Sequence, residues 1–144
     1  MKKILGLAAL LCLTACSSGG VDDDSLKPVD RALNVKHVCL KGSTRGAPDL
    51  FVDNLKTSLK KKNITSELVR EPKELVNCEH VLAFSVKGNR NIVAKAKLRL
   101  TDATNKNTKG LVAYKRKGDE KDRVEQTGLQ GQTDSMIGQL FKNY

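Results

Sequence analysis

The segment from Ala94 to Leu100 constrains the fold more than any other part of the sequence, because it alternates strictly between small or apolar residues and basic ones. In a strand, residues two apart share a face of the sheet. One face would therefore carry Ala94, Ala96, Leu98 and Leu100, and the other would carry Lys95, Lys97 and Arg99. This pattern predicts an antiparallel sheet with one face packed on a core and the other in water.

The remaining elements follow from hydrophobic spacing and turn residues. Phe51, Leu55 and Leu59 recur every four residues, which predicts an amphipathic helix from Pro48 to Lys62. A closing helix is expected from Thr133, whose side chain would cap its first turn. Further strands are expected at Val35–Leu40, Ile64–Val69, His80–Lys87 and Gly110–Lys117, with a helical turn at Lys73–Asn77 and an edge strand at Arg123–Thr127.

This order of elements predicts one α+β domain covering residues 35–144. The economical arrangement is a two-layer sandwich, in which a mostly antiparallel sheet of about five strands carries two helices on one face.

The first fifteen residues have the layout of a secretory signal peptide, with two lysines followed by a largely apolar stretch over residues 4–13. The sequence Leu13-Thr14-Ala15-Cys16 resembles a bacterial lipobox, which implies cleavage before Cys16 and lipidation of that cysteine. An ordinary signal peptide with a chance cysteine is the alternative. By resemblance to enterobacterial lipoproteins, Ser17 favours sorting to the outer membrane, with the protein facing the periplasm.

Residues 16–34 are expected to form the lipidated Cys16 and a flexible tether to the membrane. The segment is polar, contains glycine and includes the acidic run from Asp22 to Asp24. Such a composition does not supply the apolar surface that a core requires.

Two cysteines, Cys39 and Cys78, remain after lipidation, and an oxidising compartment favours a disulfide between them. In the chain-entropy model such a bridge contributes about 4 kcal/mol. Antiparallel pairing of their strands would instead set Cys39 opposite Cys78 and His37 opposite His80, which could form a Cys₂His₂ metal site. Two unpaired thiols are the third interpretation. Parallel pairing would separate the cysteines by several residues and disfavour either bond.

Basic residues dominate the predicted domain. The chain has 26 Lys and Arg against 16 Asp and Glu, a net charge of +10, and residues 35–117 hold 19 of the basic and 7 of the acidic residues. The candidate anion-binding residues are Lys95, Lys97, Arg99, Lys115, Arg116 and Lys117. They predict a sheet face that binds an anionic envelope ligand, such as lipopolysaccharide phosphate or a cell-wall polymer. The alternative is a solvated face whose lysines discourage aggregation.

Several function classes are disfavoured. With three Phe, two Tyr and no Trp, the chain lacks the aromatic platforms of a base-stacking nucleic-acid binder. No catalytic constellation is recognised, since both histidines adjoin cysteines and Ser43 lacks the G-x-S-x-G context. No cofactor is expected. The loop from Gly42 to Gly46 precedes a helix and could hold an anion, with a plain connection as the alternative.

The sequence resembles a family of small, uncharacterised, periplasm-facing lipoproteins of proteobacteria. The resemblance rests on Val38-Cys39-Leu40 in the first expected strand, on Cys78 before the strand at His80–Lys87, on the three-stranded meander that starts with this strand, and on the closing Gln139-Leu140-Phe141. The order of elements is also loosely similar to that of lipopolysaccharide-assembly and curli-secretion lipoproteins. The resemblance implies a non-enzymatic accessory or assembly role at the outer membrane, exerted through contacts with other envelope proteins.

Overall fold

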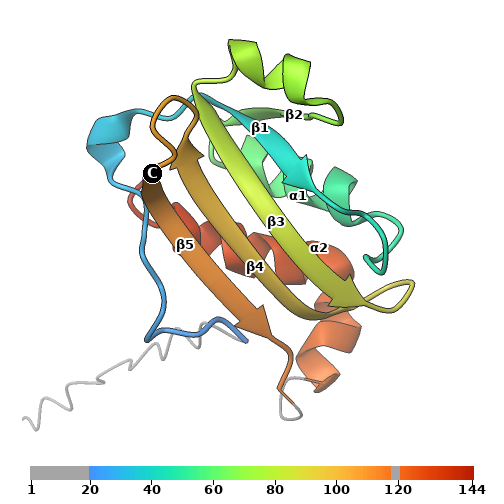
Figure 1. The fold of residues 1–144 in the computed structure, drawn as a ribbon. Coiled ribbons are helices and arrows are strands. Elements are labelled where there is room, and N and C mark those ends of the chain that lie inside the picture. The colour runs from blue at the N-terminus through green and yellow to red at the C-terminus, as the bar shows by residue number, and fades with distance from the viewer. Residues whose placement is uncertain (1–19, 118–120) are drawn as a thin grey trace, which may run out of the picture.

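A five-stranded open sheet carries two helices on one face (Figure 1). The computed structural model describes residues 20–117 and 121–144. The strands are β1 (His37–Gly42), β2 (Thr65–Leu68), β3 (His80–Gly88), β4 (Val93–Asp102) and β5 (Thr108–Lys115). The helices are α1 (Phe51–Lys61) and α2 (Lys121–Leu140), with short 3₁₀ helices η1 (Arg31–Leu33) and η2 (Pro72–Asn77). The expected α+β sandwich is therefore confirmed.

The sheet is mixed, with the strand order β2-β1-β3-β4-β5. The meander from β3 to β5 is antiparallel, as expected. The other half is parallel, because β1 runs in the same direction as both β2 and β3. The connections through α1 and η2 carry the chain back along the sheet, so each following strand starts from the same end as the one before it.

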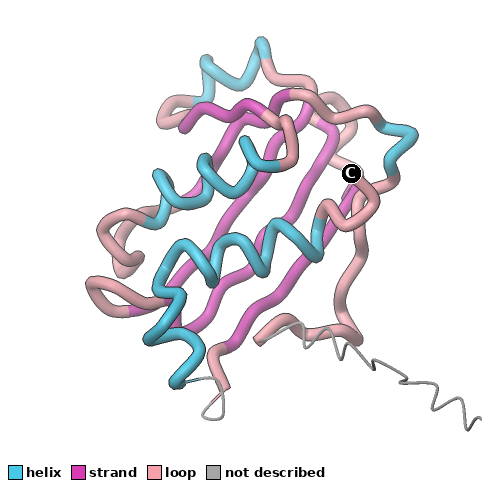
Figure 2. The backbone as a smooth tube through the Cα atoms, turned by 180° about the vertical axis from the view of Figure 1, so that it is seen from behind, coloured by secondary structure: helices cyan, strands magenta, loops and turns pink. Residues whose placement is uncertain are grey.

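The main core lies between the sheet and the two helices, which run side by side across its rear face (Figure 2). The alternation in β4 is confirmed from Lys95 onward, since Ala96, Leu98 and Leu100 are buried and the basic residues between them are exposed. Ala94 was expected in the core but is exposed. The register of the β3–β4 pairing shifts at this point, so Val93 takes the inward position instead.

A polar cluster that is buried at Ser58 and Thr133 joins the two helices. The Ser58 hydroxyl of α1 lies 2.8 Å from Thr133 Oγ1 and 2.7 Å from Asp134 Oδ1 of α2. Gln130 donates to Ser58 Oγ and to the same Asp134 oxygen, both at 2.9 Å. Lys61 reaches the other carboxylate oxygen of Asp134 at 2.7 Å. Buried hydroxyls that are hydrogen-bonded in this way fix the helix pair in one register.

Residues 20–27 lie along the outer edge of β5, and Val29 and Asp30 contact the C-terminal end of the chain. The prediction of a flexible tether extending to Asn34 is therefore wrong for this segment. Val21 and Lys27 form antiparallel bridges to Tyr114 and Leu111. Val29 is fully buried, and its N–H donates to the carbonyl of Leu140. The burial of Val21 and Val29 holds this segment on the domain, although the residues between them are mostly polar. Residues 16–19 of the predicted tether lie outside the described residues.

The closing helix begins twelve residues before the predicted start, at Lys121 rather than Thr133. It contains a break at Gly128, whose φ of 65° is in the left-handed region that glycine tolerates. Thr133 is a buried interior residue rather than a cap, and helix replaces the edge strand predicted for 123–127. The apolar residues at the end of the chain are buried, namely Met136, Ile137, Leu140 and Phe141. None of the described helices is both long and apolar enough to span a bilayer.

Cys39 and Cys78 form a disulfide, with their Cα atoms 6.0 Å apart. The expectation that parallel strands would keep these cysteines apart is wrong. Cys39 pairs in register with Val81, but Cys78 directly follows η2, and this part of the chain packs over one end of the sheet on the face opposite the helices. There the disulfide packs with Val69 and Val81 in a second, smaller core.

Candidate functional site on the open face of the sheet

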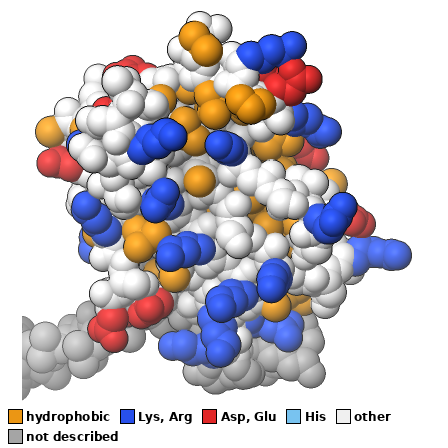
Figure 3. All heavy atoms as spheres, viewed as in Figure 1, with side chains coloured by type: hydrophobic (Ala, Val, Ile, Leu, Met, Phe, Trp, Pro, Cys, Tyr) orange, Lys and Arg blue, Asp and Glu red, His pale blue; other side chains and the backbone are white. Residues whose placement is uncertain are grey.

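The face of the sheet opposite the helices is the candidate site. Its upper end is covered by η2, and below this cover the outward side chains of β3, β4 and β5 are open to solvent (Figure 3). Lys95, Lys97 and Arg99, which the sequence placed on one face of β4, are all exposed there. The structure adds two basic residues that sequence reasoning missed, Lys41 of β1 and Lys87 of β3.

Three lysines lie directly beside one another near the end of this face. Lys87 is the register partner of Lys95, and Lys95 is the register partner of Lys115. We call Lys87, Lys95 and Lys115 the lysine row. Like charges directly opposite each other on neighbouring strands destabilise a sheet. The lysine row therefore does not stabilise the sheet, and a bound anion would reduce the repulsion between its three lysines.

The next two cross-strand rows are less charged. Lys97 lies between Ser85 and Ala113, and Arg99 lies between Ala83 and Leu111. Lys41 extends the second of these rows, since it is the partner of Ala83 in β1. The face thus combines a band of cations with small and apolar side chains between them.

The cations of this face have no acidic partners within the described residues. The ion pairs found there join His37 to Glu67, Lys61 to Asp134 and Lys73 to Glu71. None of them involves the lysine row, Lys97 or Arg99. The positive charge of the face is consequently available to a ligand.

A groove of about 520 Å³ runs along β4 and β5 beside the lysine row. Its basic lining residues are Lys95, Lys97, Lys115 and Lys117, and Leu111 and Ala113 contribute apolar surface. The N-terminal segment forms its outer wall with Gly20, Asp22 and Ser25. A smaller hollow of about 280 Å³ shares Lys95 and Lys97 and adds Ser85 and Lys87. The volume of the larger groove falls within the usual range of ligand sites.

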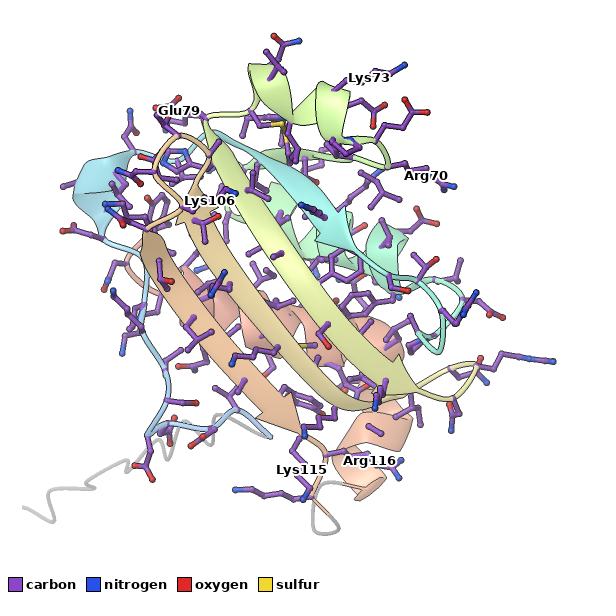
Figure 4. The ribbon with its side chains drawn as sticks, viewed as in Figure 1. Arg70, Lys73, Glu79, Lys106, Lys115 and Arg116 are labelled. Atoms are coloured by element: carbon purple, nitrogen blue, oxygen red, sulfur yellow. A yellow bond between two sulfur atoms is a disulfide. The ribbon has the colours of Figure 1, made fainter. Side chains whose placement is uncertain are left out.

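The two basic residues that follow Lys115 also stay close to this end of the sheet. The N–H of Arg116 donates to the carbonyl of Ala94, which extends the pairing of β5 with β4 by one residue. Lys115 and Arg116 lie together at the end of β5, and Lys106 lies at the opposite end of the β4–β5 hairpin (Figure 4). The six predicted candidates therefore share one face or one end of it.

The Cys₂His₂ metal site, considered as the alternative to the disulfide, is not formed. The sulfurs of Cys39 and Cys78 are joined in the disulfide and supply no thiolate. His37 instead lies 2.7 Å from Thr65 Oγ1 and 3.3 Å from Glu67 Oε1 of β2. His80 is buried and pairs in register with Asp102 of β4. Antiparallel pairing of β1 and β3, on which the metal interpretation depended, does not occur.

The loop from Gly42 to Gly46 lines a different groove, of about 550 Å³, between the end of β1 and η2. Lys41 and Arg70 stand at its sides (Figure 4 labels Arg70), and Leu68, Val69 and Leu75 contribute apolar surface. The loop does not lead directly into the first helical turn, because α1 begins only at Phe51. The lipidation candidate Cys16 lies outside the described residues.

The geometry defines an α+β open-faced sandwich with a basic outer face. No family model and no curated protein matches the chain. Two solved structures of PelC dodecamers from Paraburkholderia phytofirmans are similar to it. One is 15% identical with a TM-score of 0.51, covering 83% of this chain and 92% of that chain. The other, a single-substitution variant, is 16% identical with a TM-score of 0.51, covering 85% and 95%. At this identity the likeness concerns the fold alone.

Proposed function

We propose that the protein is an outer-membrane lipoprotein, anchored through Cys16 and facing the periplasm, that serves without catalysis as an accessory of the cell envelope. Its working surface is the basic open face, and its ligand is a polyanion of the envelope. Lipopolysaccharide phosphates and anionic cell-wall polymers are the two sources of that chemistry.

The lysine row is the observation that carries this proposal. Lys95 lies between two other lysines on neighbouring strands, with no acidic partner among the described residues. A solvated face needs scattered charge only, so three adjacent like charges have a cost that solubility does not explain. A polyanion would neutralise the row and would also bind along the adjacent groove.

Two further features support an envelope location. The lipobox at Leu13–Cys16 supplies a membrane anchor of the kind that bacterial lipoproteins carry. The disulfide between Cys39 and Cys78 suits an oxidising compartment, such as the periplasm, because cytosolic thiols are kept reduced.

A second candidate function is a structural role through contacts with other proteins. The likeness in fold to PelC, whose solved structures are described as dodecamers, favours it. So does the free outer edge of β2, which has β1 as its only strand neighbour in the described sheet. In this case the ligand of the accessory would be an envelope protein or further copies of the chain.

Charge reversal separates the two candidates. The variant Lys95→Glu/Lys97→Glu/Arg99→Glu should lose binding to immobilised lipopolysaccharide, and the salt dependence of binding should disappear with it. A control of the same charge change away from the face is Lys36→Glu/Lys56→Glu/Lys142→Glu, and it should retain most of the binding. Equal binding by both variants would reject the polyanion proposal.

In-cell crosslinking of the lipidated chain, followed by mass spectrometry, tests the second candidate. One dominant protein partner, retained by the charge-reversal variant, would favour the structural role. Crosslinks confined to lipopolysaccharide or cell-wall material, and lost in that variant, would favour the polyanion binder.

A further inference from the structure

We infer that the lysine-row end of the open face docks on the anionic phospholipid headgroups of the leaflet that holds the chain's own lipid. This inference rests on the proposed lipidation of Cys16 and goes beyond the proposed function, because it adds phospholipid headgroups to the two anionic ligands named there. In place of the flexible tether expected over residues 16–34, it predicts that the domain is held against its membrane.

The first step concerns the contact of Gly20 and Val21 with β5. The carbonyl of Gly20 accepts a hydrogen bond from the N–H of Lys115 at 2.9 Å. The next residue, Val21, is only 3% exposed and bridges to Tyr114. A Cβ on Gly20 would collide with the carbonyl oxygen of Lys115, so the backbone lies directly against β5. The fold therefore holds the chain at residue 20.

The second step is the reach of the remaining chain. Cys16 and Gly20 are separated by four peptide units, which span at most about 14 Å when fully extended. The lipid on Cys16 enters the bilayer, so Gly20 lies within about this distance of the headgroups. The Debye length at physiological ionic strength is about 8 Å, and a link of this maximum reach allows the cations beside Gly20 to approach the headgroups within that distance.

The third step is what surrounds Gly20. Gly20 lines the same groove as Lys95, Lys115 and Lys117. Lys87 completes the lysine row beside them, and Arg116 lies at the end of β5 (Figure 4). The residues brought closest to the membrane by the short link are thus the most basic part of the sheet. Each Lys or Arg near an anionic membrane surface contributes about 1 kcal/mol, or roughly fivefold in affinity.

Among the described residues, the acidic run next to Gly20 lies on the edge of β5. Asp22 also lines the groove, and its carboxylate accepts hydrogen bonds from Ser25 Oγ at 2.8 Å and from the N–H of Asp24 at 3.1 Å. The run from Asp22 to Asp24 follows the outer edge of β5, so Asp22 borders the groove from this edge, whereas Lys95 and Lys97 border it from β4. Phosphate groups would therefore favour contact through the face and disfavour contact through this edge.

The short link also favours phospholipid over a diffusing polymer. A ligand in the same leaflet as the anchor is presented to the groove at the high effective concentration of an intramolecular contact. A moderate affinity of the face for headgroups is then sufficient to keep the domain docked.

The test uses the mature chain from residue 16 with Cys16→Ser, so that protein–headgroup contacts alone are measured. Vesicles of phosphatidylcholine with phosphatidylglycerol should bind this chain, and vesicles of phosphatidylcholine alone should not. Lys95→Gln/Lys115→Gln should weaken binding by at least about tenfold. The matched variant Lys36→Gln/Lys142→Gln, which removes the same charge far from the row, should bind as the parent does. Asp24→Asn should strengthen binding a few-fold.

Each outcome has a separate meaning. Loss of vesicle binding in the row variant, with an unchanged circular dichroism spectrum and melting temperature, supports the docked orientation. Binding that both double variants retain equally would overturn it. Absence of vesicle binding together with retained lipopolysaccharide binding would overturn the docking inference and leave the proposed function standing. Absence of both would remove the proposed function as well.

Discussion

The side-chain amide of Gln132 pairs with the backbone of Val93 through two hydrogen bonds, as a neighbouring strand residue would. Its Oε1 accepts from the N–H of Val93 at 2.8 Å, and its Nε2 donates to the carbonyl of Val93 at 2.9 Å. The same Nε2 donates to the hydroxyl of Tyr114 at 2.8 Å. Val93 lies where the β3–β4 register shifts. There the side chain of Gln132 provides hydrogen-bond partners for both the buried N–H and the carbonyl of Val93.

Replacing Gln132 should be costly. Gln132→Leu keeps the volume but leaves the buried N–H and carbonyl of Val93 without partners, and the free energy of unfolding should fall by about 2–4 kcal/mol. Urea denaturation measures this change. Gln139→Leu, the same substitution at a half-buried position of α2, should change it by less than about 0.5 kcal/mol. Equal losses for both variants would contradict the pairing.

Reversing one charge in the lysine row should stabilise the protein while it impairs binding. Lys95→Glu converts two repulsive cross-strand pairs into attractive ones, and the free energy of unfolding should rise by about 0.5–1 kcal/mol. Lys36→Glu, the same change outside the row, should have little effect. Thermal and urea melts check both variants. A less stable Lys95→Glu protein would show that the row is not repulsive in the free molecule.

Removing the disulfide should weaken the whole fold. The bond joins residues 39 positions apart in the sequence. For a loop of this length, Cys39→Ala/Cys78→Ala should lower the free energy of unfolding by about 3–4 kcal/mol. Denaturation of the parent with and without a reductant gives an independent comparison. Identical curves for the parent under the two conditions would mean that the bridge contributes nothing to stability.

Stability should depend on pH through Asp134. Partial burial alone would raise the pKa of this carboxyl, but hydrogen bonds from Lys61, Ser58 and Gln130 lower it below its ordinary value of 3.8. A lowered pKa in the folded state means that the stabilisation is complete above the ordinary value and is lost as the pH falls through the folded one. Asp134→Asn should therefore be less stable than the parent at neutral pH, by about 1 kcal/mol after allowance for solvent screening. The difference should shrink as the pH falls below 3.8 and disappear once the carboxyl is protonated in the folded parent. Denaturation curves that keep a constant offset into acid would contradict this assignment.

The N-terminal segment should behave as part of the domain. Val29 is fully buried, and Val29→Ala should lower the free energy of unfolding by about 2 kcal/mol through lost burial and a small cavity. Val76→Ala, at a side chain that is 82% exposed, is the matched control and should have almost no effect. A silent Val29→Ala variant would restore the interpretation of this segment as a tether.

The elements that sequence predicts well here are those with a local signal. The alternation in β4 and the four-residue spacing of Phe51, Leu55 and Leu59 report directly on which side chains are buried. The basic face follows from the same alternation once the neighbouring strand is known. Lys41 and Lys87 were missed because their membership of the face depends on strand order, which no local pattern encodes.

The elements that sequence misses depend on tertiary contacts. Val21 and Val29 are isolated apolar residues in a polar segment, and only the groove beside β5 and the end of α2 makes them anchors. The first half of α2 is polar and interrupted by Gly128, so it lacks the periodic stripe that marks a helix. The cysteine pairing was anticipated from composition, but its geometry was not, since η2 rather than a strand brings Cys78 to Cys39.

The two edges of the sheet differ in how they are covered, and this difference limits how copies of the chain could assemble by strand addition. Residues 21–27 cover the backbone of β5, whereas β2 presents an edge without a strand beside it in the described sheet. A sheet with two open edges can extend without limit, as fibres do. With a single open edge, strand addition between identical chains ends after one symmetric pairing of β2 with β2. The segment beside β5 therefore also prevents the sheet from growing at this edge.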